Sequence, residues 1–117
     1  MPLKSFEKST NIALIVEALR RDGAVVVNEL AEPGLIDAIC DELRPELDAS
    51  GLKRKSVFNG SKTLRCSSSV LSIEASAASL LDHDMVVEVA NAVLLPHCAT
   101  YQIGSMSAIE ILPGESA

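Results

Sequence analysis

The chain has 117 residues, of which 48% are hydrophobic, and this length and content suffice for one globular domain with a core. Its net charge of −6 argues against a protein that binds nucleic acid through a basic surface, because such binding depends on neutralising phosphates. No apolar run approaches the ~20 residues of a membrane-spanning helix and no signal peptide is visible, so we expect a soluble, cytoplasmic protein without membrane contact.

Residues 1–8 show no pattern and are expected to form a frayed end or a short lead-in, and the first helix is predicted after them. Apolar residues recur with helical spacing over Ile12–Leu19, and either Ser9 or Thr10 is expected to cap the start of the helix. Gly23 is expected to end it, because glycine readily adopts the left-handed conformation found after helix ends.

A short strand and a second helix follow. The β-branched run Ala24–Val27 predicts the strand, and Pro33 suits the first turn of the helix. An apolar stripe then continues to Leu47. Pro45 lies inside this stripe and lacks an N–H, so we expect a kink or a break near Arg44.

The segment Ala49–Ser69 is polar, with Val57-Phe58 as its one apolar anchor, and we expect a long mobile loop. Thr63–Cys66 within it is a candidate for a short strand. The basic residues Lys53-Arg54-Lys55, with Lys62 and Arg65 nearby, indicate either a solvated loop or a site for a small anion.

Two further helices are predicted before Pro96. Helical spacing over Ile73–Leu81 indicates the first, and Asp84 is expected to cap the second. The tripeptide Asp82-His83-Asp84 has the charges of an acid/base site, but aspartate is an ordinary capping residue. Capping is therefore the favoured interpretation.

The C-terminal stretch alternates like a strand twice, over Cys98–Ile103 and Met106–Leu112, and Pro113-Gly114 closes the second run. In this second run Ile109 and Ile111 share one face, which is expected to pack against the rest of the protein. Because both faces are mostly apolar, we expect the first strands of a larger sheet that this chain does not complete.

Metal binding is not indicated by the spacing of the ligand types. The available side chains follow neither C-x-x-C nor H-x-D, which favours Cys40 and Cys98 as small buried side chains and the histidines as residues that cap or flank helices. These side chains are Cys40, Cys66, Cys98, His83 and His97.

Three segments together resemble a known family. They are IVEALRRDGAVVVNEL (Ile15–Leu30), FNGSKTLRC (Phe58–Cys66) and HDMVVEVANAVLLPHCATYQIGSMSAIEILPGESA (His83–Ala117). In this order and spacing they are similar to the N-terminal half of the phytanoyl-CoA dioxygenase family, the Fe(II) and 2-oxoglutarate-dependent oxygenases built on a double-stranded β-helix. The family's F-x-G-x-x-T-x-R pattern is matched by Phe58, Gly60, Thr63 and Arg65.

The resemblance implies an α+β fold and a single partial domain over residues 1–117. A helical flank at 10–97, with a short strand near 24–28, would pack on the first strands, at 98–117, of a jelly-roll or cupin-like barrel. The barrel would be truncated before the H-x-D motif that binds iron. In the full-length parent, Fe(II) and 2-oxoglutarate would serve to hydroxylate a small organic substrate. The chain as given, without iron ligands, is expected to hold neither of these two cofactors and to be inactive alone.

The resemblance also points to residues on the 2-oxoglutarate side. Arg65 is expected to meet a carboxylate of the cosubstrate, and Met106, Ala108 and Glu110 are expected to face the barrel lumen. Alternatives remain open, since Arg65 also fits a surface charge and Glu110 a solvent-facing edge. The rival function is a non-catalytic interaction module that pairs through an open strand edge, with self-association through residues 98–112.

Overall fold

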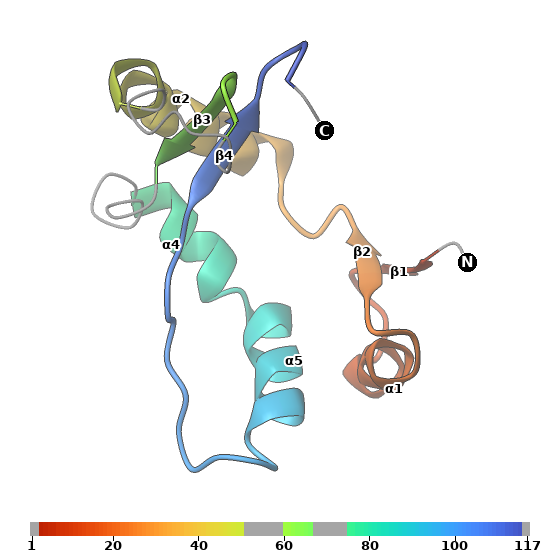
Figure 1. Cartoon of the computed structure of the whole chain (residues 1–117). Helices are drawn as coiled ribbons and strands as arrows, with labels where there is room; N and C mark the ends of the chain where they lie inside the picture. Colours follow the sequence, from red (N-terminus) through yellow and green to blue (C-terminus); the bar gives the residue numbers. More distant parts are fainter. Residues whose placement is uncertain (1–2, 51–59, 67–74, 116–117) are drawn as a thin grey trace. The chain divides into compact units, whose positions relative to one another are not determined.

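The computed structural model describes residues 3–50, 60–66 and 75–115. Over these ranges the fold is α+β, with four helices and two separate two-stranded sheets (Figure 1). Neither sheet closes into a barrel within the described part of the chain. No helix there is long and apolar enough to cross a membrane. The chain divides into two compact units, residues 1–33 with 79–102 and residues 34–78 with 103–117. The expectation of a single domain stays a prediction.

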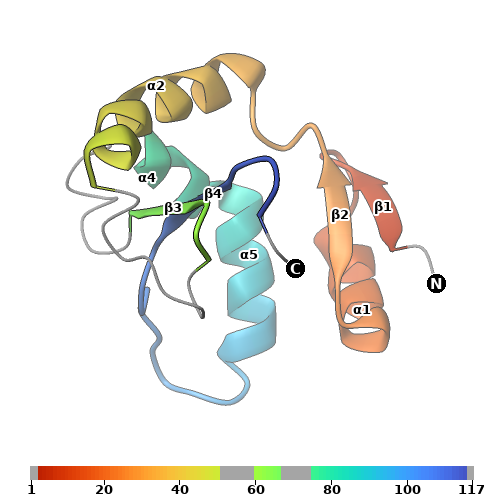
Figure 2. The same cartoon turned by 45° about the horizontal axis from the view of Figure 1, so that its top comes forward.

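The first unit begins with a strand that the sequence did not reveal. β1 (Lys4–Glu7) pairs in parallel with β2 (Val25–Asn28), so the expectation of a patternless lead-in was wrong (Figure 2). β1 buries only Phe6, and its other side chains are exposed. A strand with a single buried side chain has no alternation that a sequence pattern can detect.

Helix α1 (Ile12–Asp22) connects these two strands. Its N-cap is Asn11, whose Oδ1 accepts a 2.9 Å hydrogen bond from Ala13 N, and not Ser9 or Thr10 as expected. Thr10 is still held in the preceding turn, because its N–H donates to the Glu7 carbonyl. Gly23 ends the helix as predicted, with φ of 79° and its N–H bonded to the Leu19 carbonyl.

Helix α5 (Asp84–Leu94) completes the first unit. The capping interpretation of the Asp82–Asp84 segment is confirmed, but the cap is His83, whose Nδ1 accepts from Met85 N at 3.2 Å. Arg20 of α1 donates a 3.0 Å hydrogen bond to the Ala92 carbonyl of α5. The buried core of this unit consists of Phe6, Ile15, Ala18 and Met85, with Ile12, Val25, Val27, Leu30 and Val89 packed against it.

The strand predicted over Cys98–Ile103 is absent, and this segment has no regular backbone pairing. Its polar side-chain atoms bond back to α5 instead. Tyr101 Oη donates to Asn91 Oδ1 at 2.6 Å, and the Cys98 thiol donates to the Leu94 carbonyl at 3.2 Å. Alternation of residue types predicted a strand here, but a strand also needs a partner backbone, and this segment follows the helix.

The second unit contains α2 (Pro33–Ser50), β3 (Thr63–Cys66) and β4 (Ala108–Ile111), and α4 (Ala75–Leu81) contributes Ala77 to its core. α2 starts at Pro33 as predicted and continues through Pro45, so of the two alternatives near Arg44 the break was wrong, and the kink stays a prediction. Leu43 and Leu47, on either side of Pro45, both pack in the core and hold the helix there. Because α2 reaches Ser50, the start of the predicted loop is helical.

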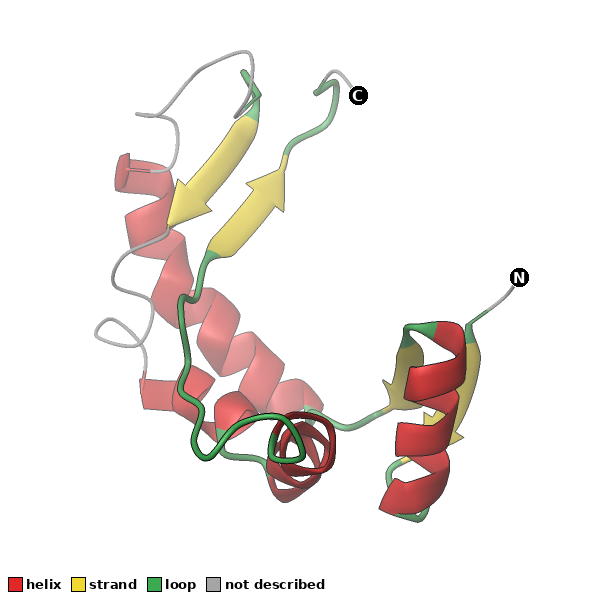
Figure 3. Cartoon of the chain, turned by 60° about the horizontal axis from the view of Figure 1, so that its bottom comes forward, coloured by secondary structure: helices red, strands yellow, loops and turns green. Residues whose placement is uncertain are grey.

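β3 and β4 confirm two predicted strands and pair antiparallel (Figure 3). The core beneath them consists of Leu47, Leu64, Cys66 and Ala77, with Leu43, Met106, Ala108 and Leu112 packed against it. The rest of the predicted loop, with Lys53–Lys55 and Val57-Phe58, lies outside the described residues except for 60–66, as does the start of the helix predicted at Ile73.

Candidate functional site

The pairing of β3 with β4 determines which residues share a face. In an antiparallel pair, residues opposite each other point to the same side of the sheet. One face therefore carries two partner pairs, Thr63 with Ile111 and Arg65 with Ile109, and the other face carries Leu64 with Glu110 and Cys66 with Ala108.

The helices cover the face that carries Leu64, Cys66 and Ala108. The expectation that Ile109 and Ile111 pack against the rest of the protein was therefore wrong, because their exposed fractions are 51% and 69%. Successive side chains of a strand point to opposite sides, so packing of the partly buried Ala108 against the core turns both isoleucines outward. The face that carries these two isoleucines is called the open face below.

Glu110 lies on the covered face and is held by α2. Arg44 Nη2 donates a 2.8 Å hydrogen bond to Glu110 Oε2, and the same nitrogen lies 2.9 Å from Asp48 Oδ1. This hydrogen bond from Arg44 lowers the pKa of Glu110 below its ordinary value. In return, the hydrogen bond to Glu110 raises the pKa of Arg44, with a smaller contribution from Asp48. Glu110 thus links the helix to the strand, while its side chain, 38% exposed, also reaches solvent.

Arg65 lies on the open face, opposite Ile109. The residue is half-buried, and its Nε is buried without a hydrogen-bond partner among the described residues. A guanidinium group presents several N–H donors in a planar fork that fits a carboxylate, and a buried donor without a partner costs free energy. Arg65 is therefore a candidate for binding an anion, and this role stays a prediction.

The four residues predicted to meet 2-oxoglutarate do not lie together. Ala108 and Glu110 are on the covered face with Met106 in the core beside them, whereas Arg65 is on the open face. Their role in binding a cosubstrate stays a prediction. Of the four, Arg65 is the residue whose side chain is left with an unpaired donor.

A second cluster of polar contacts joins the end of β4 to the start of β3. The Glu115 carboxylate accepts hydrogen bonds from Ser61 N at 3.2 Å, from Lys62 N at 2.5 Å and from the Thr63 hydroxyl at 3.0 Å. No pattern in the sequence predicted this cluster. The signal available was an acidic residue directly after the Pro113-Gly114 turn.

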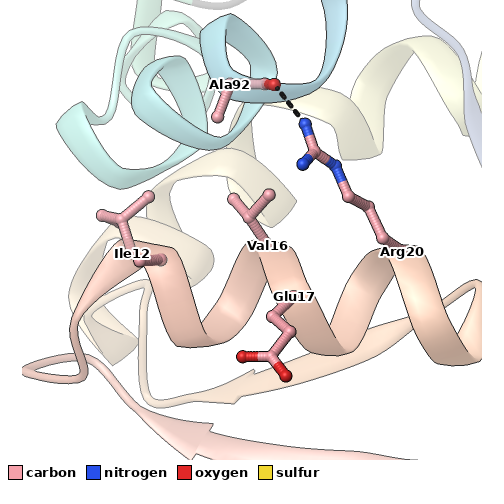
Figure 4. A pocket seen from close by; sticks show the side chains of 6 residues that line it. Ile12, Val16, Glu17, Arg20 and Ala92 are labelled. Carbon is pink, nitrogen blue, oxygen red and sulfur yellow. Dashed lines mark hydrogen bonds between the residues drawn. The ribbon is translucent and has the colours of Figure 1, made fainter.

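The first unit contains two cavities without chemical groups suited to catalysis. Figure 4 shows the larger of the two, with a volume of about 470 Å³. The Arg20 guanidinium in its lining donates to the Ala92 carbonyl. Glu17 is the acidic side chain of this lining. The other, of about 390 Å³, is lined almost entirely by apolar side chains of α1, β2 and α5 and by Leu30. The first cavity is lined by Glu17 and Arg20, but the Arg20 guanidinium is bonded to the Ala92 carbonyl, and the second cavity has no titratable side chain in its lining.

A metal site is not formed by the described residues, because no three of their His, Cys, Asp and Glu side chains lie together. Cys40 and Cys98 are both exposed, so the expectation that they are buried was wrong. Neither the models of known protein families nor the curated protein sequences include a match to this chain. The candidate site therefore consists of the open face with Arg65 and the Glu115 cluster at the end of the same sheet.

Proposed function

We propose that the chain is the N-terminal portion of a 2-oxoglutarate-dependent oxygenase of the phytanoyl-CoA dioxygenase type, which hydroxylates a small organic substrate. β3 and β4 would be early strands of its double-stranded β-helix. A sheet with helices on one face and two exposed isoleucines on the other is consistent with this role, because strands of a barrel keep one face for the interior.

The observation that carries the proposal is the unpaired Nε of Arg65 beside Ile109 on the open face. In this proposal, Arg65 binds one carboxylate of 2-oxoglutarate through paired N–H donors. Ile109 and Ile111, which are exposed on the same face, would lie beside this ion pair as apolar side chains of the barrel interior. Glu110 does not take part, because its carboxylate is already bound to Arg44.

Iron does not fit the described residues, which offer no group of three ligands. The resemblance implies that the iron ligands of such an oxygenase follow the Pro-Gly turn. No step of the reaction is therefore assigned to a metal on this part of the protein.

The test is titration of the purified chain with 2-oxoglutarate, followed by the NMR shifts of β3 and β4 amides. We expect Arg65→Gln to weaken binding by roughly tenfold or more, because a charge-assisted pair is lost, and Arg65→Lys to restore part of it. Arg21→Gln is the matched control, since Arg21 is exposed and paired with Asp22 in the other unit. Equal affinity of the Arg65→Gln variant and the unchanged chain would refute the proposal.

The second candidate is a non-catalytic interaction module that pairs through a strand of this sheet. The exposure of Ile109 and Ile111 on a four-residue strand favours it, because an isolated two-stranded sheet is only marginally stable in water. Binding of 2-oxoglutarate that depends on Arg65 favours the oxygenase, whereas self-association without such binding favours the module.

A further inference from the structure

Three hydrogen-bond donors of the turn Gly60–Thr63 point toward the same carboxylate. The N–H groups of Ser61 and Lys62 and the hydroxyl of Thr63 all donate to the carboxylate of Glu115. These donors are consecutive in the chain, whereas Glu115 comes more than fifty residues later, so the carboxylate enters the turn from outside.

The backbone of this turn has the form of an anion-binding nest. Successive N–H groups point to the same side when a residue beside them adopts the left-handed conformation, and such concavities bind anions. Gly60 has φ of 83°, and a Cβ there would overlap the Glu115 carboxylate and lie 2.8 Å from Thr63 Oγ1. Only glycine fits both the conformation and the space.

The opposite side of the contact is equally constrained. Glu115 follows Gly114, whose φ is 80°, and Lys62 Nζ would lie 2.7 Å from a Cβ at that position. The Leu112 N–H also donates to the Lys62 carbonyl at 3.0 Å. The Pro113-Gly114 turn therefore positions the Glu115 carboxylate within hydrogen-bond distance of the nest. The Lys62 ammonium group lies close to Gly114.

We propose that Gly60–Thr63 is a carboxylate-binding nest, that Glu115 is its internal ligand, and that a free carboxylate occupies the same three donors when Glu115 is withdrawn. Glu115 is then a latch that fastens the segment after β4 to the start of β3. This inference stands apart from the proposed oxygenase function, because Arg65 is not one of the donors.

The experiment removes the Glu115 carboxylate from the nest and supplies a free carboxylate, acetate, in its place. Glu115→Ala should lower the midpoint of thermal unfolding, and sodium acetate at constant ionic strength should raise it again. In the same variant, acetate should give saturable NMR shifts of the Ser61 and Lys62 amides. The unchanged chain and an Asp41→Ala control should show neither effect, since Asp41 is an exposed acid of α2 in the same unit.

Three results would overturn the assignment of a carboxylate-binding nest. Acetate effects that are equal in all three proteins would indicate general salt screening and overturn the proposal, and so would their absence in Glu115→Ala. A response to inorganic phosphate but not to acetate would contradict the carboxylate assignment.

A milder variant keeps the test valid if Glu115→Ala does not fold. Glu115→Gln retains one acceptor oxygen but loses the charge, so hydrogen exchange at the Ser61 and Lys62 amides should be faster than in the unchanged chain. Unchanged exchange at both amides would contradict the latch.

Discussion

Arg44 of α2 donates a 2.8 Å hydrogen bond to Glu110 of β4, a residue 66 positions later in the chain. This contact holds a C-terminal strand against a helix from the first half of the chain. Its two partners are charged, so its contribution to stability depends on pH.

Acidification should weaken this link. The pKa of Glu110 is lowered in the folded protein, so the folded state holds a proton at Glu110 less readily than the unfolded chain does. The stabilisation is therefore present at pH values above the ordinary range of a carboxyl group and is lost as the pH falls through the lowered pKa. Glu110→Gln should reduce the free energy of unfolding at neutral pH and have a smaller effect near pH 3.

Urea denaturation at several pH values measures this difference, with Glu88→Gln on α5 as a control in which an exposed carboxylate is neutralised. A difference between the Glu110→Gln variant and the unchanged chain that stays constant from neutral to acidic pH would contradict the ion-pair interpretation.

The core of the first unit should depend strongly on Ile15, whose exposed fraction is 1%. Ile15→Ala removes apolar contacts and leaves a cavity, so we expect a loss of about 2–5 kcal/mol in the free energy of unfolding. Leu14→Ala, at the neighbouring position with an exposed fraction of 53%, should change it by about 0.5 kcal/mol or less. Urea denaturation followed by circular dichroism compares the two, and similar losses would mean that α1 presents a different face to the core.

The start of α1 gives a prediction that separates the observed cap from the expected one. Asn11→Ala removes the acceptor of the Ala13 N–H and should cost about 1 kcal/mol. Ser9→Ala should have little effect, because Ser9 is exposed and precedes the cap. Thermal unfolding of the two variants provides the measurement, and a larger destabilisation by Ser9→Ala would place the cap where the sequence first suggested.

Self-association should depend on the open face. We expect the chain to associate at tens of micromolar through β4, and Ile109→Lys to reduce this association by placing a charge on the exposed strand. Val87→Lys is the matched control, because it makes the same change of charge at an exposed apolar position of α5. Sedimentation velocity distinguishes the cases, and an unchanged chain that is already monomeric would exclude association through this face.

Local sequence patterns predicted the elements whose signals are local. The spacing of apolar residues in α1 and α5, the left-handed Gly23 and the strand at Ala108–Ile111 all follow from neighbours within one or two turns of chain. The buried face of β4 does not follow from its own sequence, since Ala108 and Ile109 are both apolar. Burial of Ala108 rather than Ile109 depends on packing against α2 and α4, which are distant in sequence.

The same reason applies to the polar contacts. Arg44 and Glu110 are ordinary charged residues in sequence, and only the pairing of β3 with β4 and the packing of α2 bring them together. Glu115 likewise gains its role from a turn that lies in another part of the chain. β1 escaped detection because its stability comes from pairing with β2 and from the single side chain of Phe6.

The parallel pairing of β1 with β2 around α1 implies an order of assembly. This β–α–β segment occupies the continuous stretch Lys4–Asn28, so its ends meet after closure of a short loop. Thr63 must instead find Ile111 across most of the second half of the chain, a contact of high sequence separation that forms slowly. During synthesis on the ribosome, β1, α1 and β2 can associate early. β3 can pair only after β4 has emerged from the exit tunnel.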